Sequence, residues 1–290
     1  MPPSPTQPPT VRHRRLSAEL KRLREAAGVS TEAAGEAIGA FRTKIHRIER
    51  GEWRRLRESD IRRLASLYGV DKTREEALVA MAKEASRLGW WARYTDVLGP
   101  GSYTSLEASA SSVRFYSGML IPGLLQTAGY AEAVFKGWGI DDPDEVQRRL
   151  EARRERQRLI EQQERPAVEA IIDQAALNKL IGSPATMAEQ LLHLINTMER
   201  EKAKILVLPD EAGAHAALTG QFAIIEFSAS PDATITEDPV VFIDSAHNGL
   251  FLEEHEEVAS YLGIYDKLRT SALDSGESRR FISRLANNLI

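Results

Sequence analysis

The sequence predicts a multidomain chain, with an all-α domain followed by an α+β domain that has a small, mostly antiparallel sheet. Apolar residues recur at helical spacing through residues 11–88, and beyond residue 102 helical segments are mixed with short apolar runs. Charge is also divided unevenly between these two parts. A length of 290 residues suits two domains, at about 150 residues for each.

The net charge of −4 is the sum of two unlike parts. Residues 11–70 contain 15 Lys and Arg against 8 Asp and Glu, a net charge of +7, and residues 1–10 have no charged side chain. The remaining 23 cations and 34 anions give residues 71–290 a net charge of −11. This division favours a polyanion-binding module joined to a domain of another kind, although a solvated basic face would give the same count.

Composition excludes several classes of protein. Hydrophobic residues at 42% and charged residues at 28% exclude a mostly disordered or fibrous chain. The absence of cysteine excludes disulfides and thiolate metal sites, and fits a reducing compartment. Apolar stretches all fall short of the ~18 residues that a membrane span needs, so we expect a cytoplasmic protein. Five prolines within residues 1–10 predict a disordered arm that lacks the features of a signal peptide.

The first domain is predicted to contain five helices. Leu16, Leu20 and Leu23 recur at helical spacing, which predicts a first helix over residues 12–27. Ser30 is a suitable N-cap for a second, short helix. Further helices are predicted over residues 42–50, 58–68 and 72–88, which completes a domain at residues 11–88.

Residues 89–101 are expected to bridge the domains, because Trp90, Trp91 and Tyr94 make this segment too apolar for a free linker. The second domain is predicted at residues 102–290. Its expected helices cover residues 105–117, 123–136, 142–163, 173–180, 185–200, 253–273 and 276–288. Its expected strands cover residues 167–172, 204–208, 221–227, 239–243 and 250–252. This order favours an α+β domain.

The most specific motif is VSTEAAGEAIGAFRTKIHRIERG at Val29–Gly51, in which two short helices flank a tight turn at Gly39. We expect Ala34 and Gly39 to permit close approach of the two helices. Ile45 and Ile48 would face inward, which leaves the polar residues of the second helix outside. These exposed candidates are Arg42, Thr43, Lys44, His46 and Arg47. In helix-turn-helix motifs the start of this helix enters the DNA major groove, where Arg can bridge guanine O6 and N7.

This stretch resembles the xenobiotic-response-element type of helix-turn-helix, shared with phage-repressor-like regulators. The matching positions are Glu32, Gly39, Ile45, Ile48, Glu49 and Gly51, and the differing ones are Ala34, Gly35, Ala40 and Phe41. Phe41 cannot cap the second helix, and Gly35 would weaken the first by about 0.5–1 kcal/mol relative to Ala. The resemblance implies base contacts from Arg42, Thr43 and Arg47, and a phosphate-contacting position at Thr31.

The resemblance extends along the chain. It includes LYGVD at 67–71, LIPGLLQTAGYAEAV at 120–134, DQAALNKLIGSP at 173–184 and VLPDEAGAHAALTGQFAIIEF at 207–227. These segments resemble actinobacterial regulators with a large C-terminal domain of unknown function, the WhiJ-type, antitoxin-like regulators of streptomycetes. This family typically has Glu where Gln174 and where Asp244–Ser245 stand. The resemblance implies a cytoplasmic transcriptional regulator, often paired with a small acidic partner protein that the second domain is thought to bind.

The second domain contains one cluster that suggests chemistry. Asp210, Glu211 and His215 share a predicted loop and could form a general acid–base pair or part of a metal site, but a polar loop between two strands is the favoured explanation. We expect the latter, with no catalytic residues, metal or cofactor, so the chain is not expected to be an enzyme. The charge run at 148–158 is interpreted as an exposed helix with salt bridges rather than a second nucleic-acid site.

Aromatic residues gather between positions 90 and 138. They suit packing within and between domains, but could also form a groove for a partner or effector. The candidate groove residues are Trp90, Trp91, Tyr116, Pro122, Leu124, Leu125 and Tyr130.

The sequence therefore predicts a sequence-specific regulator of transcription that binds double-stranded DNA, and no membrane, and associates with the nucleoid when bound. One recognition helix covers few base pairs, so we expect a homodimer on a partly palindromic site with half-sites about 10 base pairs apart. The alternatives are an antitoxin-like module that holds a small acidic partner protein, or a DNA-tethered enzyme using Asp210, Glu211 and His215.

Overall fold

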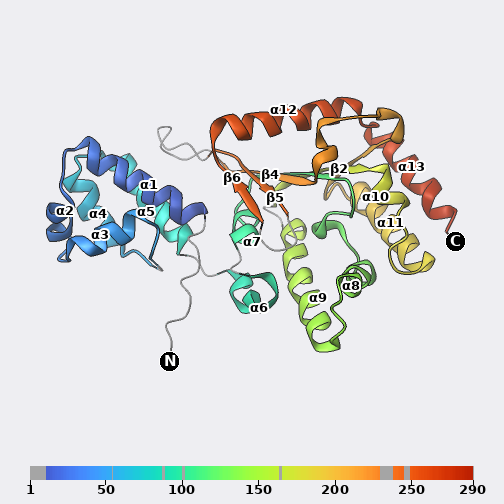
Figure 1. Cartoon of the computed structure of the whole chain (residues 1–290), viewed down its shortest axis with the longest axis horizontal. Helices are drawn as coiled ribbons and strands as arrows, with labels where there is room; N and C mark the ends of the chain where they lie inside the picture. The colour runs from blue at the N-terminus through green and yellow to red at the C-terminus, as the bar shows by residue number, and fades with distance from the viewer. Residues whose placement is uncertain are drawn as a thin grey trace. The chain divides into compact units, whose positions relative to one another are not determined.

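The computed structural model describes residues 11–53, 55–86, 89–99, 102–162, 165–228, 238–244 and 249–289, without the side chains of Arg12, Glu84 and Ser102. The proline-rich arm expected at 1–10 lies outside these residues. The chain forms two compact units that divide between residues 92 and 93, inside the segment expected to bridge the domains (Figure 1).

The first unit is helical. Its helices are α1 (Val11–Ala26), α2 (Thr31–Ala37), α3 (Arg42–Glu49), α4 (Glu58–Leu67) and α5 (Lys72–Ala85). The 3₁₀ turn η1 (Trp90–Tyr94) spans the division between the units. The prediction of five helices is confirmed. Their inward residues form one core around Leu16, Leu20, Ile45 and Leu64, each at most 1% exposed. Packing around this core stabilises helices that are too short to be stable alone.

The turn between α2 and α3 requires glycine at two positions, for different reasons. Gly39 has φ +64°, a left-handed conformation that glycine adopts without strain, and a Cβ there would meet nothing within 4 Å. A Cβ on Gly35 would stand 2.7 Å from the carbonyl oxygen of Ala40. The close approach of the two helices therefore depends on Gly35, not on Gly39 as expected from the sequence. Because the site has no room for a Cβ, helix propensity does not decide which residue suits position 35.

A largely buried ion pair joins α1 to α3. Arg24 Nε lies 2.5 Å from Glu49 Oε1, and Arg24 Nη2 lies 3.1 Å from Glu49 Oε2. The remaining amino group, Nη1, donates to the Val29 carbonyl at 3.0 Å. The hydrogen bond that Arg24 donates to Glu49 raises the pKa of Arg24. A bidentate pair constrains both distance and direction, so it sets the position of α3 against α1 and the loop that follows α1.

The second unit contains six strands and the remaining helices (Figure 1). Its strands are β1 (Ser112–Ser117), β2 (Ala167–Asp173), β3 (Lys204–Leu208), β4 (Phe222–Glu226), β5 (Val240–Ile243) and β6 (Leu250–Leu252). Its α-helices are α6 (Thr95–Leu98), α7 (Ser102–Glu107), α8 (Ala128–Gly137), α9 (Pro143–Gln157), α10 (Gln174–Asn178), α11 (Pro184–Glu199), α12 (His255–Ser271) and α13 (Ser275–Asn287). Short 3₁₀ turns are η2 (Gly123–Leu125), η3 (Arg158–Glu161), η4 (Asp210–Ala212) and η5 (Ala216–Thr219).

The strands form one sheet in the order β3-β2-β1-β4-β5-β6. The pairs β1–β2 and β2–β3 are parallel, whereas β1–β4, β4–β5 and β5–β6 are antiparallel. The predicted α+β domain with a mostly antiparallel sheet is therefore confirmed. Helical crossovers explain the parallel pairs, because parallel neighbours need a long connection.

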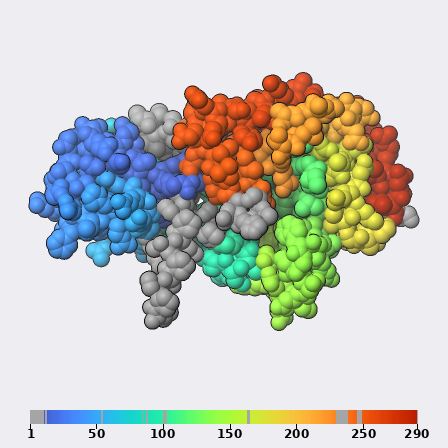
Figure 2. Space-filling view, in the orientation of Figure 1, coloured from blue at the N-terminus to red at the C-terminus, as the bar shows by residue number. Residues whose placement is uncertain are grey.

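Helices cover both faces of the sheet. Tyr265 and Leu268 of α12 pack on one face against Phe222 and Leu206. The opposite face contacts α8, α11 and α13, and α11 and α13 lie side by side (Figure 1; Figure 2). Strand β3 stands at one edge, where the hydroxyl of Ser278 accepts a hydrogen bond from Val207 N at 2.9 Å. This contact closes part of an otherwise open strand edge.

Three predicted helices have different boundaries in the structure. The helix expected over residues 142–163 ends as an α-helix at Gln157 and is followed by the 3₁₀ turn η3. The helix expected over residues 105–117 is wrong beyond Glu107, because Ser112–Ser117 form the central strand β1. Val113 and Phe115 are buried on one face of this strand, which pairs on both sides, so tertiary pairing overrides local helical spacing. The helix expected over 123–136 is divided into η2 and α8, where Thr127 caps the N-terminus of α8.

Within the part of the chain that the structure describes, no helix is both long and apolar enough to cross a membrane.

Replacing Gly35 by alanine should destabilise the first unit. The new Cβ would press on the backbone of Ala40, and overpacking of this kind costs about 1–3 kcal/mol, more than the gain in helix propensity. Urea unfolding of the full chain, followed by circular dichroism, measures the change. Gly263→Ala in α12 is the matched control: its Cβ would meet nothing within 4 Å, so it should stabilise the chain by about 0.5–1 kcal/mol. Stabilisation by both variants would contradict a steric requirement at Gly35.

Removing the negative charge of Glu49 should also destabilise the first unit. Glu49→Gln leaves Arg24, whose side chain is only 12% exposed, without its buried anion, at a cost of about 3 kcal/mol. Glu25→Gln is the control, since Glu25 contacts the same arginine at 3.5 Å but is 56% exposed, and its loss should cost under about 0.5 kcal/mol. Equal effects of the two variants in urea unfolding would show that α3 does not depend on the buried pair.

Candidate nucleic-acid interface

The outer face of α3 presents four of the predicted site residues. Arg42, Thr43, His46 and Arg47 are exposed. The opposite face of the helix is fixed, because Ile45 and Ile48 are 1% and 2% exposed in the core. The structure therefore brings these four polar side chains together on one outward surface, which we call the α3 face.

Both arginines of the α3 face have weak partners within the first unit. Arg42 Nη1 donates to Glu32 Oε1 at 3.3 Å, and this pair is well exposed. Arg47 Nη2 donates to the Glu52 carbonyl at 3.3 Å. An exposed ion pair contributes little to stability, so a DNA phosphate or base can replace Glu32 at small cost.

Thr31 and Lys44 are placed differently. Thr31 is the half-buried first residue of α2, and its hydroxyl donates to Glu32 Oε2 at 3.2 Å. Lys44 Nζ lies 2.8 Å from Asp60 Oδ2, and the Asp60 side chain is 8% exposed. The ion pair of Lys44 with Asp60 thus joins α3 to α4, whereas Arg42 and Arg47 face solvent.

Phe41 is an additional residue at this surface that the sequence analysis did not assign to DNA binding. It occupies the N-cap position of α3 without a side-chain cap, as expected, and it is 85% exposed. A large apolar side chain beside Arg42 suits contact with a thymine methyl group. The sequence signal for Phe41 is an aromatic residue at a position where helix-turn-helix motifs of this type usually have Ser or Thr.

Further cations follow α3. Arg50, Arg55 and Arg57 are exposed, and no ion pair of theirs is present among the residues that the structure describes. The segment that carries them is anchored to α1, because Trp53 Nε1 donates to Ser17 Oγ at 3.1 Å and Leu56 is buried. These arginines suit phosphate contacts, which position a protein on DNA without reading its sequence.

Two candidate catalytic residues of the second unit have partners outside their own loop. Asp210 accepts a hydrogen bond from Gln174 Nε2 at 2.7 Å. His215 lies instead beside Asp173, with 3.6 Å between His215 Nε2 and Asp173 Oδ2, and its ring meets Tyr116 edge-on. Across the described ranges, no group of three or more His, Asp or Glu side chains is arranged to hold a metal ion.

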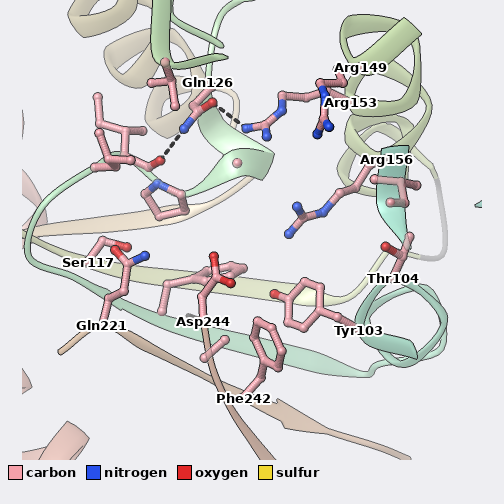
Figure 3. Close-up of a pocket in the computed structure, with 18 of the residues that line it drawn as sticks. Tyr103, Thr104, Ser117, Gln126, Arg149, Arg153, Arg156, Gln221, Phe242 and Asp244 are labelled. Carbon is pink, nitrogen blue, oxygen red and sulfur yellow. Dashed lines mark hydrogen bonds between the residues drawn. The ribbon is translucent and has the colours of Figure 1, made fainter. Parts of the chain in front are cut away.

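The candidate groove is only partly assembled. A cavity of about 320 Å³ in the second unit is lined by Tyr116 and Pro122 (Figure 3). Leu124, Leu125 and Tyr130 do not line it, because each is 0% exposed in the core, where the turn η2 directs both leucines. Trp90 and Trp91 belong to the first unit and pack edge-on against each other, with 6.1 Å between their rings.

The charged helix α9 has two kinds of surface. Salt bridges form as expected, at 2.7 Å for Arg149–Glu145 and at 2.9 Å between Glu155 and Arg158, the residue that follows α9. Arg153 and Arg156 instead line the cavity, so the interpretation of the whole run as an exposed helix is wrong at these positions. The sequence signal for them is their spacing with Arg149 at i, i+4 and i+7, which places the three on one helix face.

Comparison with known proteins gives two family matches. A helix-turn-helix domain matches residues 15–78, and a domain of unknown function (DUF5753) matches residues 101–284. No curated protein and no solved structure matches the chain. Because the second match covers well over half of its length, the chain belongs to the DUF5753 family, and it carries a helix-turn-helix domain before that region.

Proposed function

We propose that the protein is a sequence-specific transcriptional regulator that reads the major groove of DNA with α3 and uses its second domain for oligomerisation, or for partner or effector binding. The observation that carries this proposal is the α3 face, with Arg42, Thr43, His46 and Arg47 directed to solvent from a helix-turn-helix whose other face is locked in the core.

The chemistry of the α3 face suits base recognition. A guanidinium can donate two hydrogen bonds to guanine O6 and N7, and a threonine can contact either a base edge or a thymine methyl. The net charge of +7 over residues 11–70 favours association with phosphates and makes binding depend strongly on salt. The net charge of −11 over residues 71–290 opposes non-specific coating of DNA.

Dimerisation supplies the remaining specificity in this proposal. One α3 helix contacts too few base pairs, so two copies bind a partly palindromic site with half-sites about 10 base pairs, or a multiple of that, apart. The second domain supplies the contacts between copies.

A partner protein is the second candidate, favoured by the resemblance to WhiJ-type, antitoxin-like regulators of actinobacteria. In this form the second domain holds a small acidic protein. In this proposal the regulator acts by binding rather than by catalysis. Loss of regulation in both Asp210→Ala and His215→Ala would instead favour catalysis.

Alanine at Arg42 or Arg47 should remove discrimination between DNA sites. Each lost guanine contact costs about 1–3 kcal/mol against the selected base, with a smaller effect on unrelated sequences. The measurement is fluorescence anisotropy of the full chain on a site selected from random DNA and on single-base variants of that site. Arg57→Ala removes the same charge and is the control, since loss of a phosphate contact weakens binding to all sequences equally. Uniform weakening by Arg42→Ala and Arg47→Ala would contradict their role as base readers.

The purified chain should be a homodimer by light scattering, and on selected DNA it should protect two half-sites. Copurification from native cells with a small acidic protein, at equal amounts and without dimerisation, would favour the partner-binding alternative. A monomer that protects one half-site would contradict the dimeric form of the proposal.

A further inference from the structure

A cavity of about 320 Å³ opens within the second unit between the sheet and α9 (Figure 3). Its apolar side includes Phe115, Phe135, Trp138 and Phe242. Figure 3 shows Arg149, Arg153 and Arg156 on one side of the cavity, and Asp244 on the side opposite them. This volume lies at the small end of the range of roughly 300–1,000 Å³ that is typical of ligand pockets. The cavity suits a small molecule with an apolar body and one polar end.

Two of the three arginines are already neutralised. Arg149 pairs with Glu145 at 2.7 Å. Arg156 donates to both carboxylate oxygens of Glu107, at 2.5 and 2.7 Å, and the Glu107 side chain is 1% exposed. Tyr103 donates a third hydrogen bond to Glu107 at 3.0 Å. Burial lowers the pKa of Arg156, but the charge and hydrogen bonds of Glu107 outweigh it and hold that pKa above its ordinary value.

Arg153 differs from its neighbours, because no carboxylate contacts it anywhere in the described part of the chain. Its hydrogen-bond partner is the side-chain oxygen of Gln126, and its guanidinium lies 5.1 Å from the centre of the Phe135 ring. Burial and the like charge of Arg156 outweigh the attraction of Glu107 and lower the pKa of Arg153 to about 9, so the group is still a cation at neutral pH. A cation that is partly removed from water and has no carboxylate contact is less favourable than a paired one.

The two guanidinium groups meet over a glycine. A Cβ on Gly123 would stand 2.9 Å from Arg153 Nη1 and 3.1 Å from Arg156 Nη1. Glu107 binds Arg156 through Nε and Nη2 and does not occupy Nη1 of Arg156, whereas Nη1 of Arg153 donates to Gln126. Two guanidiniums that line the same cavity, one of them without a carboxylate partner, suit recognition of a carboxylate or phosphate group.

The side of the cavity opposite the arginines restricts which groups the rest of the ligand can have. Asp244 is exposed at the cavity, so a second anionic group at that end would be repelled. Trp138 is 60% exposed and provides an apolar surface beside the cavity.

We propose that this cavity binds a small organic anion, whose carboxylate or phosphate contacts Arg153 and Arg156 and whose apolar body contacts Phe115, Phe135 and Trp138. The site lies wholly within the second unit, and its occupancy does not require DNA.

Calorimetric titration and thermal unfolding of the full chain without DNA test the proposal. The probes are benzoate, octanoate and phenyl phosphate, with benzamide and octanamide as neutral analogues, and inorganic phosphate as the head group alone. At least one organic anion should bind saturably at one site per chain and raise the unfolding temperature. Its neutral analogue should bind at least about tenfold more weakly, as expected for loss of charge-assisted hydrogen bonds. Preference for phenyl phosphate or for the carboxylates identifies the head group.

Two variants and one control locate the binding. Arg153→Gln should weaken binding of the anion by about tenfold or more while leaving the unfolding temperature of the unliganded chain unchanged or higher, because it removes an uncompensated cation. Gly123→Ala retains both arginines but displaces their ends, and should weaken binding similarly. Arg154→Gln removes an exposed cation one residue away on α9 and should leave binding unchanged. Absence of saturable binding by all three organic anions, equal binding of neutral analogues, or full affinity in Arg153→Gln would each overturn the proposal.

Discussion

The ion pair between Arg24 and Glu49 is the constraint on which the geometry of the DNA-binding unit depends. It holds α3 to α1 through two hydrogen bonds, and the same arginine holds the loop that leads to α2 through the Val29 carbonyl. The apolar contacts of Ile45 and Ile48 decide which face of α3 is inward, but they are not directional. The bidentate pair adds direction, so the arginines of the α3 face leave the surface in a defined orientation.

The second unit contains a similar arginine–carboxylate pair, next to an arginine that has no carboxylate partner. Arg156 and Glu107 reproduce the buried bidentate pair, with Tyr103 completing the carboxylate. Arg153, one helical turn away, has an amide oxygen where a carboxylate would be expected. A structural network and a candidate ligand site therefore stand side by side on α9, and they differ only in whether the protein supplies the anion. The partner of each arginine therefore distinguishes a structural role from a ligand-binding role, which the composition of the helix cannot do.

Much of the fold was predictable because it follows from local patterns. The five helices of the first unit and the strands β2 to β6 were indicated by apolar spacing over a few residues. The strand β1 was not, because its identity depends on pairing with β2 and β4, which lie more than 50 and 100 residues away. The same limit applies to the aromatic groove: Leu124 and Leu125 are apolar neighbours of Pro122, but the turn that they form directs them into the core.

Residue spacing along the chain was enough to place Arg42 and Arg47 on one face of a helix in the cationic region. It was also enough to place three arginines on one face of α9. Tertiary structure decided which of these charges are already satisfied. Lys44 is fastened to Asp60 while Arg42 and Arg47 face outward, and Glu107 neutralises Arg156 but not Arg153. The physical reason is that helical spacing is set within a few residues, whereas an ion pair forms only where the folded backbone brings distant side chains within reach.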